Sequence, residues 1–137
     1  MKTLIWLDDI RNPLENDWLV FSPIEQPFAP VWLKSYDEFI SYIKTYGLPD
    51  AICFDHDLGL PRQLVLRNEG KSKRESRRIV REEEKTGYDC AKWLVDYCID
   101  NNKSLPLYNI QSANPVGKEN IKSLLENFKK HQLKNGI

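Results

Sequence analysis

Three ionisable side chains stand in a row where an apolar segment of the chain ends. Residues 51–54 read Ala-Ile-Cys-Phe, and Asp55, His56 and Asp57 follow them directly. Because imidazole titrates near neutral pH, His56 could act as a general acid or base between two carboxylates. The alternative is a hydrogen-bonded turn in which the three side chains have a purely structural role.

Polar residues follow two further apolar segments in the same way. Asp8 and Asp9 come after the apolar residues 3–7, and an acidic pair of this kind is also a common turn and helix-cap device. The stretch of residues 105–110 is followed by three polar side chains that could bind a ligand: Gln111, Ser112 and Asn114. The last of these also suits the start of a helix, since asparagine is a good N-cap and proline a good first helical residue.

The elements between these polar groups alternate between strand and helix patterns. Short apolar runs that suit buried strands occur at residues 3–7, 31–34, 51–54 and 105–110. Helical patterns begin after Ser35, Thr86 and Asn114. The alternation predicts a parallel α/β sheet with helices on both faces, in a single domain of 137 residues.

A charged stretch interrupts this pattern after the third predicted strand. Residues 62–85 contain nine basic and five acidic residues and no sustained apolar stripe. We interpret the stretch as an insertion that is either a solvated surface segment or a cover for a ligand site.

Composition excludes several classes of protein. Lysine plus arginine equals aspartate plus glutamate, at 20 each, so net charge does not indicate a general nucleic-acid binder. No apolar run approaches the roughly 20 residues that span a bilayer. Three cysteines without C-x-x-C spacing, at positions 53, 90 and 98, indicate reduced core residues. We therefore expect a cytoplasmic protein without membrane contact.

The polar groups at the strand ends should meet in space. In parallel α/β sheets the ligand site lies beyond the carboxyl ends of the strands. Several carboxylates at one edge would repel each other unless a hard cation lies among them, and Mg²⁺ is the natural candidate. Such a cation would also attract a phosphate, which the amide groups at the start of the last helix could help to bind.

Four motifs in this order resemble a known protein family. The segments WLDD-x-R-x-P (6–13), DHDLG (55–59), TGYD (86–89) and SANPVG (112–117) look like the cyclic-phosphate-processing branch of the response-regulator receiver domains. The likeness covers nearly the whole chain except the insertion, and it implies the receiver-like, flavodoxin-like three-layer fold. It departs from the family in two places: no receiver lysine is evident after a fifth strand, and Gln111 stands where the branch usually carries a histidine.

The resemblance implies a set of roles for the candidate residues. Asp8, Asp9 and Asp57 would hold Mg²⁺ or Mn²⁺. His56, with Asp55 and Asp57, would carry the catalysis. The ligand's phosphate would be bound by Ser112, Asn114, Arg11 and Gln111.

Three functions remain open from the sequence. The first is a metal-assisted phosphodiesterase that opens a cyclic phosphate in a nucleotide or at a small RNA end. The second is a binding module that captures a cyclic nucleotide or a phosphorylated ligand without reacting, which Gln111 favours because an amide does not transfer protons at neutral pH. The third is a receiver domain phosphorylated on Asp57.

Overall fold

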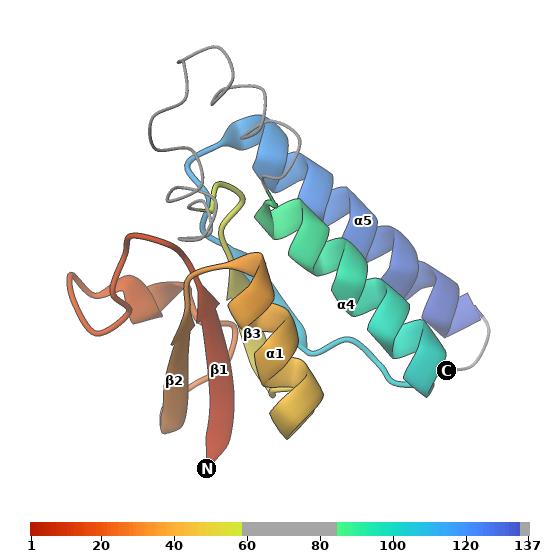
Figure 1. The fold of residues 1–137 in the computed structure, drawn as a ribbon, viewed down its shortest axis with the longest axis horizontal. Helices are drawn as coiled ribbons and strands as arrows, with labels where there is room; N and C mark the ends of the chain where they lie inside the picture. Colours follow the sequence, from red (N-terminus) through yellow and green to blue (C-terminus); the bar gives the residue numbers. More distant parts are fainter. Residues whose placement is uncertain (59–84, 135–137) are drawn as a thin grey trace, which may run out of the picture.

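A computed structural model describes residues 1–58 and 85–134 of the chain. The predicted insertion at residues 62–85 lies outside the described residues, except for Lys85. Within the described part, four parallel strands form one sheet in the order β2-β1-β3-β4 (Figure 1). The strands are β1 (Lys2–Leu7), β2 (Phe28–Leu33), β3 (Ala51–Phe54) and β4 (Leu107–Ile110).

The predicted strands are confirmed, with changes at their ends. β2 begins three residues before the expected segment and includes Pro30. Proline lacks the N–H that a central strand needs, but β2 lies at the edge of the sheet, where the loss is tolerated. β4 begins two residues later than expected, directly after Pro106.

The three predicted helices are α1 (Tyr36–Tyr46), α4 (Gly87–Asn101) and α5 (Pro115–Lys134). Each begins where a side chain binds the free backbone N–H groups of its first turn. The Ser35 hydroxyl accepts from Glu38 N at 3.2 Å, and Thr86 forms a complete capping box with Asp89. Asn114 Oδ1 accepts from Gly117 N at 3.0 Å.

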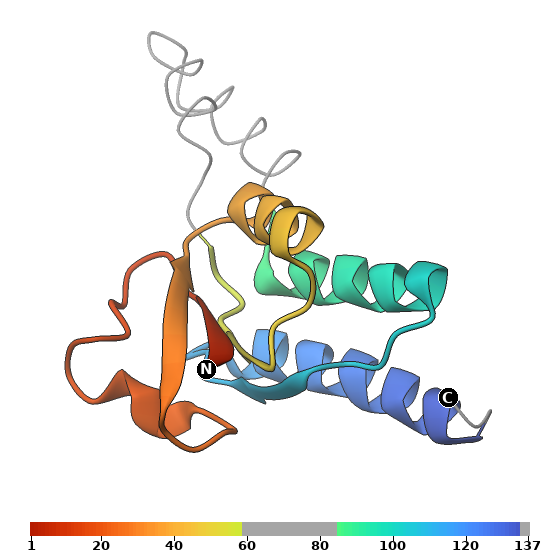
Figure 2. The same cartoon turned by 90° about the horizontal axis from the view of Figure 1, so that it is seen from below.

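The helices all pack on one side of the sheet. Their apolar side chains, including Phe39, Leu94 and Ile121, form a single buried cluster with Ile5 and Phe54. Figure 2 shows the three helices on this side and the short 3₁₀ helix η1 (Trp18–Phe21) on the other.

The second face of the sheet is therefore covered by a 3₁₀ helix and its loop, where the sequence predicts helices on both faces. Trp18, Leu19 and Ile24 pack there against buried residues of the sheet such as Trp6 and Cys53. Proline is frequent between β1 and β2, which prevents a long helix in this connection.

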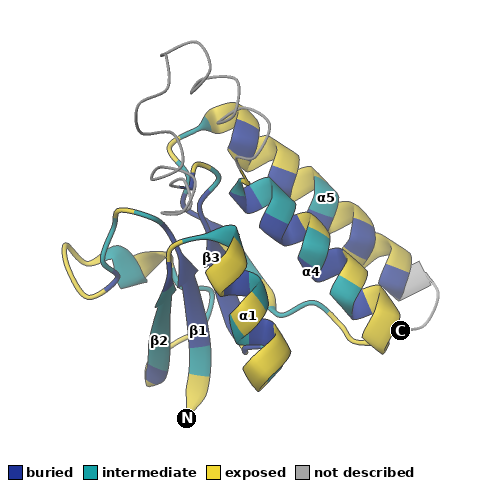
Figure 3. Ribbon diagram, in the orientation of Figure 1, coloured by how far each residue is buried: buried dark blue, intermediate teal, exposed yellow. Residues whose placement is uncertain are grey.

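Burial explains why the central strands read as continuous apolar runs. Residues 4–7 of β1 and all four residues of β3 have no exposed surface, whereas β2 at the edge is mostly half-buried (Figure 3). A strand covered on both faces has no polar side to present. The three cysteines are buried without disulfides, and burial raises the pKa of the Cys53 thiol to about 12. No helix within the described ranges has the length and apolar character needed to cross a membrane.

Candidate functional site

The strands of the sheet end level with one another, and this places three polar residues in one row. Leu7 of β1 pairs with Phe54 of β3, which pairs with Ile110 of β4. The ladder continues for one more residue, because Asp55 N donates to Leu7 O and Gln111 N donates to Phe54 O, both at 3.0 Å. The residues that follow the three strand ends form the row: Asp8, Asp55 and Gln111.

Three carboxylates gather at this row. Ligand oxygens of Asp8, Asp9 and Asp55 all lie within 4.8 Å of one another. Asp8 and Asp55 are buried, and Asp9 is half-buried. Oxygen donors in this number suit a hard cation such as Mg²⁺ or Mn²⁺.

One oxygen of this acid cluster supports its use as a cation site. Asp8 Oδ2 is buried and has no hydrogen-bond donor, although Nε of Arg11 lies 3.0 Å away. The pair has the distance of an ion pair but lacks the geometry of a hydrogen bond. Arg11 therefore supplies an opposite charge but no hydrogen bond, and a bound cation would give this buried oxygen a direct contact.

Arg11 is the only basic side chain that forms an ion pair with the acid cluster among the described residues. Its guanidinium contacts Asp8 and lies 3.7 Å from Oδ1 of Asp55. Its Nη1 donates to the carbonyl of Gln111 at 3.0 Å, and its Cζ lies 5.1 Å from the ring centre of Trp18. Arg11 thus links the ends of β1, β3 and β4.

Hydrogen bonds within the loop after β1, and one from Trp32 of β2, fold this loop around the cluster. Oδ1 of Asp8 accepts from the N–H groups of Ile10 and Arg11, both at 3.0 Å. Two indole N–H groups hold the backbone: Trp32 Nε1 donates to Asp8 O at 2.7 Å, and Trp6 Nε1 donates to Arg11 O at 2.9 Å. These contacts turn the Arg11 side chain back over the acids.

Burial raises the pKa values of two acids of the cluster, Asp55 and Asp9. Burial raises the pKa of Asp55 to about 6, and the neighbouring Asp8 adds to the shift. Arg11 and a hydrogen bond with Ser112 oppose it. Burial also raises the pKa of Asp9. In both residues burial contributes most, because a charged carboxyl group is poorly solvated there.

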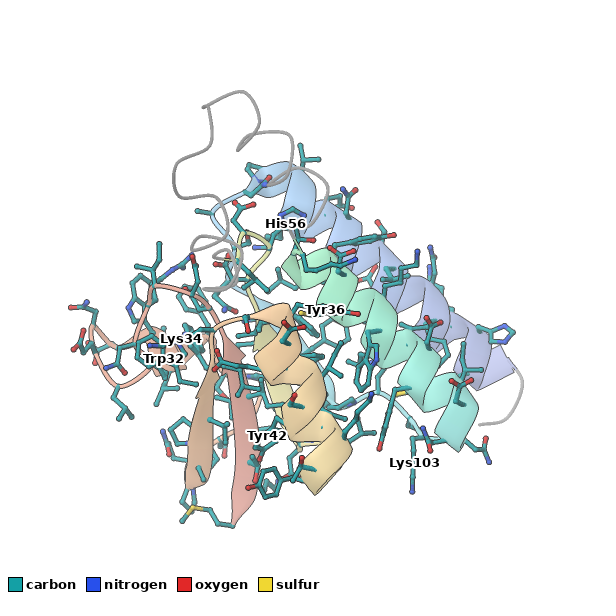
Figure 4. The ribbon with its side chains drawn as sticks, in the orientation of Figure 1. Trp32, Lys34, Tyr36, Tyr42, His56 and Lys103 are labelled. Atoms are coloured by element: carbon teal, nitrogen blue, oxygen red, sulfur yellow. The ribbon has the colours of Figure 1, made fainter. Side chains whose placement is uncertain are left out.

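A second polar group lies beside the first turn of α5 and contains His56. Nδ1 of His56 lies 2.9 Å from Oδ1 of Asp57, and the same oxygen accepts from Nδ2 of Asn114 at 3.3 Å. The bond to His56 is the main reason that the pKa of Asp57 is lowered. Figure 4 shows His56 beyond the end of β3, close to the first turns of α4 and α5.

Two glycines permit the close packing around His56. A Cβ at Gly117 would overlap the imidazole ring, and a Cβ at Gly87 would overlap the carbonyl of Asp55. Gly87 N also donates to His56 O at 2.7 Å. The TGYD and SANPVG segments therefore bring backbone, not only side chains, against the residues that follow β3.

The structure brings the predicted site residues to one edge of the sheet, but it exchanges the positions expected for Asp55 and Asp57. Asp55, which the sequence predicts as a catalytic residue, lies with Asp8 and Asp9. Asp57, which the sequence predicts as a metal ligand, lies outside this group of three and bonds to His56 and Asn114. Its charge still raises the pKa of Asp9, so the two groups are neighbours.

Of the other predicted ligand residues, Ser112 contacts both groups: it hydrogen-bonds to Asp55 and to the backbone of Asn114. Ser112 Oγ accepts from Asn114 N at 3.1 Å, and the Gln111 side chain is buried, with Nε2 donating to Leu7 O at 3.2 Å. A pocket of about 410 Å³ lies elsewhere, at the start of β4 and the end of α5, and none of the site residues lines it.

A comparison with known protein families identifies the chain. The model of one family, described as the cyclic-phosphate processing receiver domain, matches residues 3–127. The chain belongs to this family. The matched range of the cyclic-phosphate processing receiver domain includes every residue of both polar groups. Comparisons with curated proteins and with solved structures gave no match.

Membership of this family connects the domain with the processing of cyclic phosphates, and so with a phosphate-bearing ligand. Receiver domains bind Mg²⁺ through acidic residues, and the acid cluster of this cyclic-phosphate processing receiver domain has that character.

Proposed function

We propose that this chain is a metal-assisted phosphodiesterase that opens a cyclic phosphate in a nucleotide or at the end of a small RNA. One observation carries the proposal: a buried acid cluster and a carboxylate-bound histidine lie at the same edge of the sheet. Acids that can hold a cation and a histidine that can move a proton are the two components that such a hydrolysis needs.

The acid cluster is the proposed cation site. Asp8, Asp9 and Asp55 would hold Mg²⁺ or Mn²⁺, while Asp57 lies beside them with its carboxylate bound to His56. When bound, the ion would neutralise charge on the phosphoryl oxygens. Asp57 could serve as a further ligand through Oδ2, since Oδ1 is the oxygen that bonds to His56 and Asn114.

His56 is the proposed proton carrier. With Nδ1 bound to the Asp57 carboxylate, Nε2 is left as the basic nitrogen, and no described residue hydrogen-bonds to it. Nε2 would take a proton from a water molecule as that water's oxygen forms a bond to phosphorus. The ring P–O bond breaks, and the leaving oxygen receives the proton from His56, so that the product is an open phosphate monoester.

The remaining predicted residues are suited to position the phosphate. Ser112 and Asn114 lie at the start of α5, where free backbone N–H groups favour anions. Arg11 lies beside the acids and offers several N–H donors in a planar group, a shape that suits phosphate.

The proposal is tested by direct turnover. The protein is incubated with 2′,3′- and 3′,5′-cyclic nucleotides with Mg²⁺, with Mn²⁺ or with EDTA, and the phosphate monoester is quantified. We expect cation-dependent turnover that falls by roughly 10² to 10⁴ in His56→Ala. The matched control is His131→Ala, which changes the other histidine of the chain, on an exposed face of α5. Equal and negligible turnover by the unmodified protein and both variants would refute the proposed phosphodiesterase activity.

A second candidate is a module that binds the same ligand without reacting. It is favoured by Gln111, a residue that hydrogen-bonds but does not transfer protons, at a position beside the acids. Calorimetry would then show saturable binding of a cyclic nucleotide, with the ligand recovered intact. The absence of any binding heat would refute this candidate.

A further inference from the structure

Two buried side-chain oxygens in the described residues have no hydrogen-bond donor, and both belong to the row of residues at the strand ends. They are Oδ2 of Asp8 and Oε1 of Gln111. Leaving a buried acceptor without a partner is unfavourable, so most buried acceptors in proteins are satisfied. Arg11 supplies an opposite charge to Oδ2 of Asp8 without a hydrogen bond, whereas Oε1 of Gln111 has no hydrogen-bond partner among the described residues. A further positive or donating group would fit between them.

The side chain of Gln111 lies on the same side of the sheet as Asp8 and Asp55 and reaches towards the end of β1. Parallel strands in register place neighbouring side chains on the same side of the sheet, so Gln111 shares a side with Asp8 and Asp55. Nε2 of Gln111 donates to Leu7 O, the carbonyl that also accepts from Asp55 N. The Gln111 amide group thus reaches the carbonyl of Leu7, the residue directly before Asp8.

The nearby Arg11 guanidinium does not hydrogen-bond to Oε1 of Gln111. Nη1 of Arg11 donates to the backbone carbonyl of Gln111, and Nε and Nη2 face Asp8 and Asp55. The second buried oxygen without a donor, on Asp8, is also an acceptor, so the two cannot bond to each other. A divalent cation or its bound water would satisfy both.

We propose that Gln111 supplies a neutral fourth oxygen to the cation site and makes the site selective for hard cations. This inference rests on the cation of the proposed function. An amide oxygen prefers Mg²⁺ and Mn²⁺, whereas an imidazole nitrogen at the same place would favour Zn²⁺ and other borderline metals. Gln111 is thus a specificity-determining residue for the metal.

The test measures cation binding by calorimetry on the full chain, without substrate. Gln111→Leu removes the oxygen, and we expect the affinity for Mg²⁺ to fall by roughly 10- to 100-fold. Gln111→His should raise the affinity for Zn²⁺ relative to Mg²⁺ at least tenfold. The matched control is Gln132→Leu, because Gln132 is equally buried and also donates to a carbonyl, that of Lys103, away from the site.

A thermal measurement separates this role from a structural one. In EDTA, Gln111→Leu should melt no lower than the unmodified protein, since it removes an unpaired buried oxygen as well as one hydrogen bond. Added Mg²⁺ should raise the melting temperature of the unmodified protein more than that of the variant. If Gln111→Leu fails to fold, the metal preference of Gln111→His decides the question.

The possible failures are distinguishable. Unchanged Mg²⁺ affinity in Gln111→Leu and unchanged metal preference in Gln111→His would overturn the role of Gln111 alone. If the unmodified protein binds neither Mg²⁺ nor Mn²⁺, both the cation of the proposed function and this inference fail. Cation binding without turnover of any cyclic nucleotide would refute the enzyme and leave the role of Gln111 standing.

Discussion

Nδ1 of His56 lies 2.9 Å from Oδ1 of Asp57, the side chain that follows it in the sequence. Adjacent residues in a strand point to opposite faces, so a contact of this kind requires the backbone to have turned after β3. Asn114 bonds to the same carboxylate oxygen from the start of α5. The His56 ring is therefore oriented by residues from two separate parts of the chain.

Asp57→Asn should lower turnover without weakening ligand binding. The amide is nearly isosteric with the carboxylate, but it no longer stabilises a proton on His56, so we expect turnover to fall on the order of 10² while the dissociation constant of a cyclic nucleotide stays within a few-fold. Turnover and calorimetry on the same preparation check this. Turnover equal to that of the unmodified protein would mean that Asp57 does not assist His56.

Gly117→Ala should displace His56 while the fold is retained. The added Cβ overlaps the imidazole ring, which must move away from Asp57. We expect a loss of turnover of about tenfold or more, with histidine ring signals in NMR spectra shifted. Gly47→Ala is the control: its Cβ meets open space, and its φ of 85° leads to a stability loss of about 1 kcal/mol without an effect on the site.

Asp55→Asn should stabilise the protein at neutral pH in the absence of divalent cations. Folding raises the pKa of Asp55 from 3.8 to about 6, so the folded state disfavours its charged form. The contribution of Asp55 to stability is therefore favourable below pH 4 and is lost as the pH rises through about 6.

The variant Asp55→Asn has no ionisable group at this position, so the difference in unfolding free energy between the two proteins follows the titration of Asp55. Urea unfolding in EDTA should show Asp55→Asn more stable by on the order of 2 kcal/mol above pH 7, with the difference disappearing below pH 4. The same variant should lose Mg²⁺ binding. A difference in stability that does not depend on pH would contradict the assigned cause.

Arg11→Met should destabilise the protein in EDTA, and Mg²⁺ should restore much of the loss. Without the guanidinium, Asp8 and Asp55 are two buried charges with no ion-pair partner, so we expect a loss of about 2 kcal/mol. A divalent cation supplies the missing positive charge. Urea unfolding with EDTA or with Mg²⁺ measures both effects.

Lys34→Met is the control for Arg11→Met. Lys34 also lies near the site, with Nζ 4.1 Å from the ring centre of Trp32, but it forms no ion pair with the acid cluster. Its removal should have a small effect, about 0.5–1 kcal/mol, that is the same with Mg²⁺ and with EDTA. If Mg²⁺ does not reduce the stability loss of Arg11→Met, then Mg²⁺ does not bind to the acids that the Arg11 guanidinium contacts.

Features that depend on neighbouring residues could be predicted from the sequence. Ser35, Thr86 and Asn114 cap their helices as expected, because a cap is decided within four residues. The buried strands could be predicted because β1 and β3 are covered on both faces and so read as unbroken apolar runs.

Two features could not be predicted from neighbouring residues: which element covers the second face of the sheet, and which acid of DHDLG joins Asp8. The sequence indicates helices on both faces, but the packing of Trp18 and Leu19 against the sheet depends on contacts with distant strands. Similarly, DHDLG contains two acids of equal chemistry, Asp55 and Asp57, and nothing local decides which of them joins Asp8.

The amino-acid sequence by itself determined the type and order of the elements and the collection of acids, a histidine and amides at strand ends, because these depend on local pattern and on the polarity of parallel sheets. Only the tertiary structure decided that Asp8, Asp55 and Gln111 form one row while Asp57 turns to His56. The reason is physical: strand register depends on side chains packing between strands far apart in the chain, and a shift of one residue would turn each side chain to the other face.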